Sequence, residues 1–126
     1  MIEIKIKPFS VNKAWIGKQR PNREFKEFKH SLAWQLPAEK MPQGRKMIFI
    51  EFGFSSSLSD WDNCIKITQD VIADKYGFND REIDQAIISK VKVEKGNEYI
   101  KFNITSKLCG QCWLEINKLA MRGCEE

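Results

Sequence analysis

The stretch from Ser59 to Asp84 reads S-D-W-D-N-C-I-K-I-T-Q-D-V-I-A-D-K-Y-G-F-N-D-R-E-I-D. Its apolar residues recur about every 3.6 residues, which predicts an amphipathic helix. Ser59 or Asp60 is expected to cap the start of this helix, and Gly77 is expected to end it. The predicted buried stripe consists of Trp61, Cys64, Ile65, Thr68, Val71, Ile72 and Tyr76.

The polar side of this helix carries reactive groups. Asp60 and Asp62 stand at its start, and Lys66 lies one turn further on. Side chains two residues apart on a regular helix point about 200° apart, so these carboxylates can meet one cation only if Asp60 lies in the cap or the preceding loop. Asp62 and Lys66, spaced i,i+4, share a face. A second acidic group follows the helix, at Asp80, Glu82 and Asp84.

Two carboxylates and an ammonium on one surface suit magnesium chemistry on phosphate. Mg²⁺ prefers oxygen ligands, typically one or two carboxylates together with water and phosphate oxygens. The metal supplies a nucleophilic hydroxide, and a nearby lysine can stabilise a developing oxyanion. A third carboxylate from the second acidic group would complete the site. The structural alternative is that the aspartates cap the helix and that Asp62 and Lys66 form a solvated surface pair.

The pattern D-W-D-N-x-x-K-x-x-x-D, followed by G-F and N-D-R-E-I, resembles the motif of the RusA family of Holliday junction resolvases. That motif reads D-hydrophobic-D-N-hydrophobic-x-K-x-x-x-D, then a glycine region, then D-D-x-x-hydrophobic. The likeness extends loosely over Ile2 to Ile104. Two stretches depart from the family pattern: Asn79 replaces the usual first aspartate of the later pair, and Ser55–Ser59 stands where relatives often carry basic residues.

The resemblance implies the roles of four residues. Asp60, Asp62 and Asp80 would hold Mg²⁺, with Mn²⁺ as a possible substitute, and Lys66 would take part in catalysis. It also implies a homodimer that acts on four-way DNA junctions in recombination and repair, and an origin in a phage or prophage. A dimer suits this task because resolving a junction takes two cuts in opposing strands, and closed two-fold pairs are the commonest assemblies.

Charge is distributed unevenly along the 126 residues. Up to Lys46 there are 11 Lys or Arg against 4 Asp or Glu, a net +7, and the remainder has 10 against 13, a net −3. A basic half beside an acidic one is expected where one surface meets phosphates and another holds a cation. Trp15 could equally stack on an unpaired base or anchor its loop on the core. The predicted DNA-binding residues are Asn12, Lys13, Trp15, Lys18, Arg20 and Arg23.

The hydrophobic pattern predicts a single α+β domain, residues 1–126, with 105–126 as a tail outside the family motif. We expect a small mixed sheet with helices packed on it, in the order β-α-β-α-β-β and a closing helix. Gly96–Asn97 is expected to form a hairpin turn between the last two strands. The other elements are expected at Ile2–Ile6, Asn22–Leu36, Ile48–Phe54, Ile87–Val93, Ile100–Ile104 and Trp113–Met121.

Cysteine usage and hydropathy indicate a cytoplasmic protein. No apolar run approaches the ~20 residues of a membrane helix, and the first residues lack the apolar core of a signal peptide. Cys64 falls on the apolar stripe and is expected in the core. Cys109, Cys112 and Cys124 are expected to be reduced thiols, with a zinc site as the alternative, although a fourth ligand has no evident source.

The sequence therefore favours a magnesium-dependent endonuclease that resolves four-way junctions. Two alternatives stay open. One is a catalytically silent module that binds branched DNA, and the other is a metal-dependent nuclease acting on other DNA structures.

Overall fold

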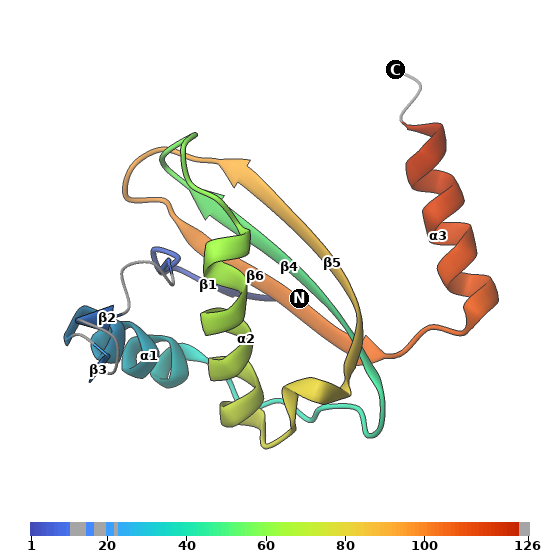
Figure 1. The fold of residues 1–126 in the computed structure, drawn as a ribbon, viewed down its shortest axis with the longest axis horizontal. Coiled ribbons are helices and arrows are strands. Elements are labelled where there is room, and N and C mark those ends of the chain that lie inside the picture. The colour runs from blue at the N-terminus through green and yellow to red at the C-terminus, as the bar shows by residue number, and fades with distance from the viewer. Residues whose placement is uncertain (11–14, 17–19, 22, 124–126) are drawn as a thin grey trace.

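The computed structural model describes residues 1–10, 15–16, 20–21 and 23–123 (Figure 1). Its strands and helices alternate along the chain in an α+β arrangement, as predicted. In order they are β1 (Ile2–Ile4), β2 (Trp15–Ile16), β3 (Arg20–Pro21), α1 (Arg23–Gln35), β4 (Lys46–Phe54), α2 (Asp62–Tyr76), the 3₁₀ helix η2 (Asp80–Glu82), β5 (Ile83–Lys92), β6 (Tyr99–Ser106) and α3 (Gly110–Arg122).

Four strands form a mixed sheet in the order β1-β6-β4-β5. β4 runs antiparallel to β6 and parallel to β5, and β1 pairs antiparallel with β6. Parallel neighbours need a crossover connection, and α2 with η2 provides the one between β4 and β5. The start of α2 is thereby tied to the central strand β4 and its end, through η2, to the edge strand β5, which places the acidic segments at either end of one helix.

The core lies between one face of the sheet and the first two helices. Along β4, Ile48, Ile50 and Phe52 are fully buried, whereas the residues between them are only half-buried. Phe28 and Leu32 of α1 belong to the same buried cluster, together with residues of α2. This alternation is the period-two pattern of a strand with one covered face, which the sequence predicted for this segment.

The predicted hairpin between the last two strands is wrong. A turn does form, since the amide of Asn97 donates to the carbonyl of Glu94 over 2.9 Å. However, β4 is inserted between β5 and β6, so these two strands are not paired. The reason is that a turn reverses the chain without fixing which strands pair, and β4 pairs along its length with both β5 and β6. The segment predicted as a loop also contains a two-stranded ribbon, β2–β3.

The N-cap of helix α2 is Trp61, two residues after Ser59 and one after Asp60, the two predicted caps. Trp61, with φ −67° and ψ −31°, occupies the N-cap position and makes no side-chain capping bond. Its carbonyl accepts the amides of Cys64 and Ile65 at 3.0 and 3.1 Å, so Ser59 and Asp60 are left in the preceding loop. Gly77 ends the helix as predicted, with a φ of +73° that favours glycine.

The burial of α2 follows the predicted stripe with one exception. Cys64, Thr68, Val71 and Ile72 are buried, and the structure adds Ile67 and Ala73 to this side. Trp61, in contrast, is 40% exposed. Its position before the first full turn explains the difference, since the stripe packs on the sheet only from Cys64 onward.

Helix α3 is longer than predicted and stands apart from the sheet in Figure 1. None of its residues is buried. Within the described residues, no helix combines the length and apolarity needed to cross a membrane.

Candidate functional site

Lys66 is the centre of a small polar cluster on the exposed side of α2. Its Nζ donates to Oδ2 of Asp80 at 2.9 Å and to Oδ1 of Asp70 at 3.0 Å. Asp70 lies one helical turn further along, and Asp80 returns to the helix from η2. Asp62, which was expected to share a face with Lys66, forms no salt bridge with it.

The protonation of this cluster follows from its contacts. The hydrogen bonds from Lys66 to Asp80 and then to Asp70 raise the pKa of the lysine, against a small opposing effect of burial. The same bond from Lys66 lowers the pKa of Asp80. All three side chains are at least partly exposed, so the pairs contribute little to stability, but the bond between Lys66 and Asp80 favours the charged form of both these groups.

Asp60 and Asp62 are exposed at the start of α2 and face different surroundings. Asp60 and Asn63 line a cavity of about 500 Å³ that opens beside the loop before the helix. Asp62 is not part of that lining. Among the described residues, neither carboxylate has an ion-pair partner, so both keep oxygen atoms available to a cation.

The donor set is chemically suited to Mg²⁺, but it is not assembled into a three-ligand site. Among the described residues, no three Asp, Glu, His or Cys side chains lie close enough to hold a metal ion. Mg²⁺ commonly binds through one or two carboxylates and completes its shell with water and phosphate oxygens. Asp60 and Asp62 therefore match its ligand chemistry, whereas Asp80 would have to exchange Lys66 for the metal.

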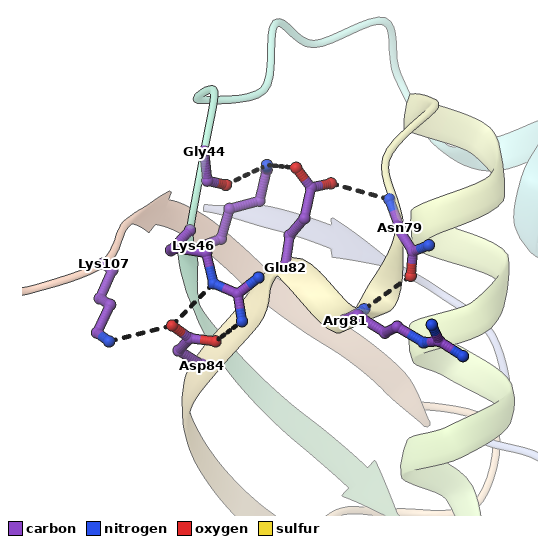
Figure 2. A network of polar contacts seen from close by, with 8 residues as sticks. Gly44, Lys46, Asn79, Arg81, Glu82, Asp84 and Lys107 are labelled. Atoms are coloured by element: carbon purple, nitrogen blue, oxygen red, sulfur yellow. Dashed lines mark hydrogen bonds and ion pairs between the residues drawn. The ribbon is translucent and has the colours of Figure 1, made fainter.

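The three acids of the second group have different partners, and Figure 2 shows those of Glu82 and Asp84. Glu82 lies 3.5 Å from Nζ of Lys46, a lysine that is only 2% exposed. The same ammonium donates to the carbonyl of Gly44 at 2.7 Å and lies 5.1 Å from the centre of the Phe78 ring. A buried cation with a carboxylate, a carbonyl and a ring around it joins η2 to the start of β4.

Glu82 also holds the backbone of η2. Its Oε2 accepts the amide of Asn79 at 2.9 Å, while Oδ1 of Asn79 accepts the amide of Arg81 at 2.9 Å, which forms a capping box. Asp80 lies between these residues, so its backbone is fixed on both sides. Asn79, which departs from the family pattern, thus has a structural task at this position.

Asp84 is paired with two cations at the start of β5 (Figure 2). Arg45 forms two hydrogen bonds to its carboxylate, at 2.6 and 3.0 Å, and Lys107 donates at 3.0 Å. The bonds from Arg45 and then from Lys107 lower the pKa of Asp84 to about 2. Asp84 therefore links the start of β5 to Arg45, just before β4, and to Lys107, just after β6. Its carboxylate is not free to bind a metal.

The predicted DNA-binding segment is only partly described. Asn12, Lys13 and Lys18 lie outside the described residues, and for Trp15 and Arg20 the structure places the backbone in β2 and β3. Arg23 begins α1, is exposed, and pairs with Glu27 at 2.9 Å. Its position leaves its guanidinium accessible to a phosphate.

Two participants were missed by sequence reasoning. Asp70 belongs to the D-W-D-N-x-x-K-x-x-x-D pattern and is spaced i,i+4 from Lys66, so the spacing could have identified it. Lys46 had no such signal, because its partner Glu82 is distant in sequence and a lysine at a strand start is ordinarily exposed.

The cysteines behave as expected in the described part of the chain. Cys64 is buried, and Cys109 and Cys112 are exposed free thiols. Cys109 caps α3, with its Sγ accepting the amide of Cys112 at 3.4 Å, and this bond lowers the pKa of the Cys109 thiol. Cys124 lies outside the described residues.

Comparison with known proteins adds no relative. No protein-family model matches the sequence, and no curated protein matches it significantly. Functional reasoning therefore rests on the motif and on the geometry around α2.

Proposed function

We propose that this chain is a metal-dependent endonuclease that cuts branched DNA, with the four-way junction as its substrate. The observation that supports it most directly is the approach of Asp80 to Lys66, 2.9 Å apart although separated by 14 positions in sequence. In the proposed mechanism the later acid and the lysine act on the same phosphate, which would require their side chains to lie close together.

In this proposal the carboxylates at the start of α2 receive the metal. Asp60 and Asp62 would be the first ligands, and Asp80 the third. Magnesium, when bound, supplies a nucleophilic hydroxide and neutralises charge at the phosphorus, and manganese is expected to replace it. Release of Asp80 would free the ammonium of Lys66, whose side chain is 65% exposed, to hold a phosphate oxygen as its charge increases.

Contacts to the DNA backbone are assigned to the basic amino-terminal half. Asn12, Lys13, Trp15, Lys18, Arg20 and Arg23 are the proposed DNA-binding residues. Binding through phosphates is salt-sensitive, because each neutralised phosphate releases counterions. We expect junction affinity to fall steeply with ionic strength, in a cytoplasmic protein that has direct access to DNA.

A homodimer is the expected assembly. Resolution requires cuts in two opposing strands, so two sites related by a two-fold axis would produce a symmetric pair of nicks. Mass measurement in solution, with and without junction DNA, tests this part of the proposal separately from cleavage.

The test of the activity is cleavage of an end-labelled four-way junction and of a linear duplex with the same sequence, each in Mg²⁺ and in EDTA. We expect paired nicks near the branch point of the junction in Mg²⁺ only. Equal cutting of the linear duplex would contradict the proposed substrate and favour a nuclease for other DNA structures.

One observation favours the alternative of a silent module that binds branched DNA. Among the described residues, no three acidic side chains lie close enough together to hold a metal ion. Tight binding of the junction without any cut in Mg²⁺ or Mn²⁺ would establish this alternative.

A further inference from the structure

Two apolar side chains are exposed directly beside the proposed metal ligands. Leu58 is 89% exposed and Trp61 is 40% exposed, and Asp60 and Asp62 directly precede and follow Trp61 in the chain. Leaving an indole in water forgoes the favourable burial of a large apolar surface. The position of this exposure, within the D-W-D motif itself, requires an explanation.

The backbone that carries these side chains is held at several points. The amide of Leu58 donates to Oγ of Ser56 at 3.2 Å, and the amide of Ser59 donates to the Ser56 carbonyl at 3.3 Å. Lys90 of β5 donates to the carbonyl of Ser59 at 2.8 Å. At the other end, the first turn of α2 fixes Trp61 through its carbonyl. Leu58 and Trp61 are therefore presented from a supported turn.

The chemistry around Trp61 selects among possible DNA groups. The flanking carboxylates repel phosphates unless a cation intervenes, so the indole is not placed to pack against an uncovered backbone. A nucleobase carries no charge, and every base has a π face that can stack on an aromatic ring. In a continuous duplex those faces are occupied by neighbouring bases, whereas a branch point interrupts the stack.

We propose that Trp61 stacks on a base at the branch point and so places the adjoining phosphate against Asp60 and Asp62. This inference rests on the proposed function, because it assumes branched DNA as the ligand. Trp61 then acts as a specificity-determining contact that distinguishes a branch from a duplex. The residue between the two aspartates would thus couple recognition of the branch to the position of the cut.

The test is a binding titration in EDTA, by fluorescence anisotropy, of a four-way junction and of a linear duplex of the same sequence. The variants are Trp61→Ala, Trp61→Phe and Trp34→Ala. Trp34, which is 81% exposed on α1, is the matched control for loss of an exposed indole. Thermal unfolding of each variant verifies that it is folded, and Trp61→Phe keeps an aromatic ring if Trp61→Ala is unstable.

We expect Trp61→Ala to weaken junction binding by about 5- to 100-fold and to leave duplex binding unchanged, as the loss of one stacked base predicts. Trp61→Phe should retain most of the affinity for the junction. Trp34→Ala should leave the affinity for both the junction and the duplex unchanged. A junction with abasic branch-point nucleotides should bind wild type and Trp61→Ala equally, because the stacking partner is then missing from both complexes.

Three results would overturn the inference: equal affinity of wild type and Trp61→Ala for the junction, an equal loss on junction and duplex, or no junction binding by wild type. An exposed Trp61 that serves a protein partner would give the first of these. Cleavage is measured separately in Mg²⁺, so a protein that binds through Trp61 but does not cut would contradict the proposed nuclease and leave this inference standing.

Discussion

The two acidic segments that flank α2 differ in how their carboxylates are neutralised. After the helix, each acid is paired with a cation: Lys66, which it shares with Asp70, for Asp80; Lys46 for Glu82; and Arg45 with Lys107 for Asp84. At the start of the helix, Asp60 and Asp62 have no ion-pair partner among the described residues. Acids that look alike in sequence are thus divided into residues that hold the fold and residues that remain open to a ligand.

Asp80 is the one member of the later segment that belongs to both groups. Its backbone is fixed by the Asn79–Glu82 capping box, yet its carboxylate is partly exposed and meets a lysine that is itself exposed. An exposed ion pair is weak, and its partners can exchange. The pair between Glu82 and the buried ammonium of Lys46 cannot be broken without leaving a buried charge unpaired. The later segment therefore combines a backbone that is held in place with one carboxylate that can change its ion-pair partner.

Among the residues of the later acidic segment and their partners, the largest expected effect comes from removing the ammonium that Asp80 shares. Lys66→Met should lower the rate of junction cleavage by about 100- to 1,000-fold, the loss typical of one group that stabilises transition-state charge. Single-turnover cleavage in Mg²⁺ measures it, with Lys75→Met, an exposed lysine near the end of the same helix, as the control. Near-normal cutting by Lys66→Met would remove the lysine from the mechanism.

The next effect concerns stability and the buried cation. Glu82→Gln preserves an acceptor for the Asn79 amide but leaves Lys46 without its carboxylate, so it should lower the free energy of unfolding by about 1–3 kcal/mol. Urea unfolding measures the loss. Glu115→Gln, on the exposed surface of α3, is the matched control and should be close to neutral. If both variants unfold alike, the Lys46 contact does not anchor η2.

A pH series sharpens the assignment of Asp84 to the structural group. Its pKa falls from the ordinary 3.8 to about 2, so the folded state favours the charged form. Its stabilising contribution is therefore complete above the unfolded pKa and is lost as the pH falls through about 2. The stability difference between wild type and Asp84→Asn should shrink between pH 5 and pH 2. An unchanged difference across that range would contradict the pairing with Arg45 and Lys107.

The smallest expected effect is a difference in reactivity between the thiols of Cys109 and Cys112, which a single contact gives different pKa values. The amide of Cys112 lowers the pKa of Cys109, whereas the neighbouring Cys109 raises the pKa of Cys112. Since the thiolate is the reactive form, Cys109 should be alkylated several-fold faster by iodoacetamide at pH 8. Mass spectrometry of wild type, with Cys109→Ser and Cys112→Ser as controls, measures the order. Faster alkylation of Cys112 would contradict the capping contact.

Much of the fold could be predicted because its signals are local. The period of the apolar residues marked α2, and Gly77 marked its end, since only a residue tolerant of positive φ fits there. The place of β4 between β5 and β6 could not be read in the same way. The position of β4 depends on which strands pair although they are far apart in sequence. The turn at Gly96–Asn97 indicated that the chain reverses direction, but not which strand pairs with β6.

The candidate site was predictable in its composition and less so in its contacts. The motif named Asp60, Asp62, Lys66 and Asp80, and the structure brings the last two together. It did not indicate that Asp70 would share the lysine in place of Asp62. Exposure of Trp61 also escaped prediction, because a periodic pattern cannot tell the first helical turn from the half-turn before it.

In the proposed mechanism, an open carboxylate at the start of α2 is required for cutting. The most direct measurement compares the rate of junction cleavage in Mg²⁺ by Asp62→Asn with that by Asp74→Asn, the same change of charge at an exposed position of the same helix. We expect that Asp62→Asn binds the junction and does not cut it, while Asp74→Asn cuts at the wild-type rate. Equal rates for the two variants would contradict it.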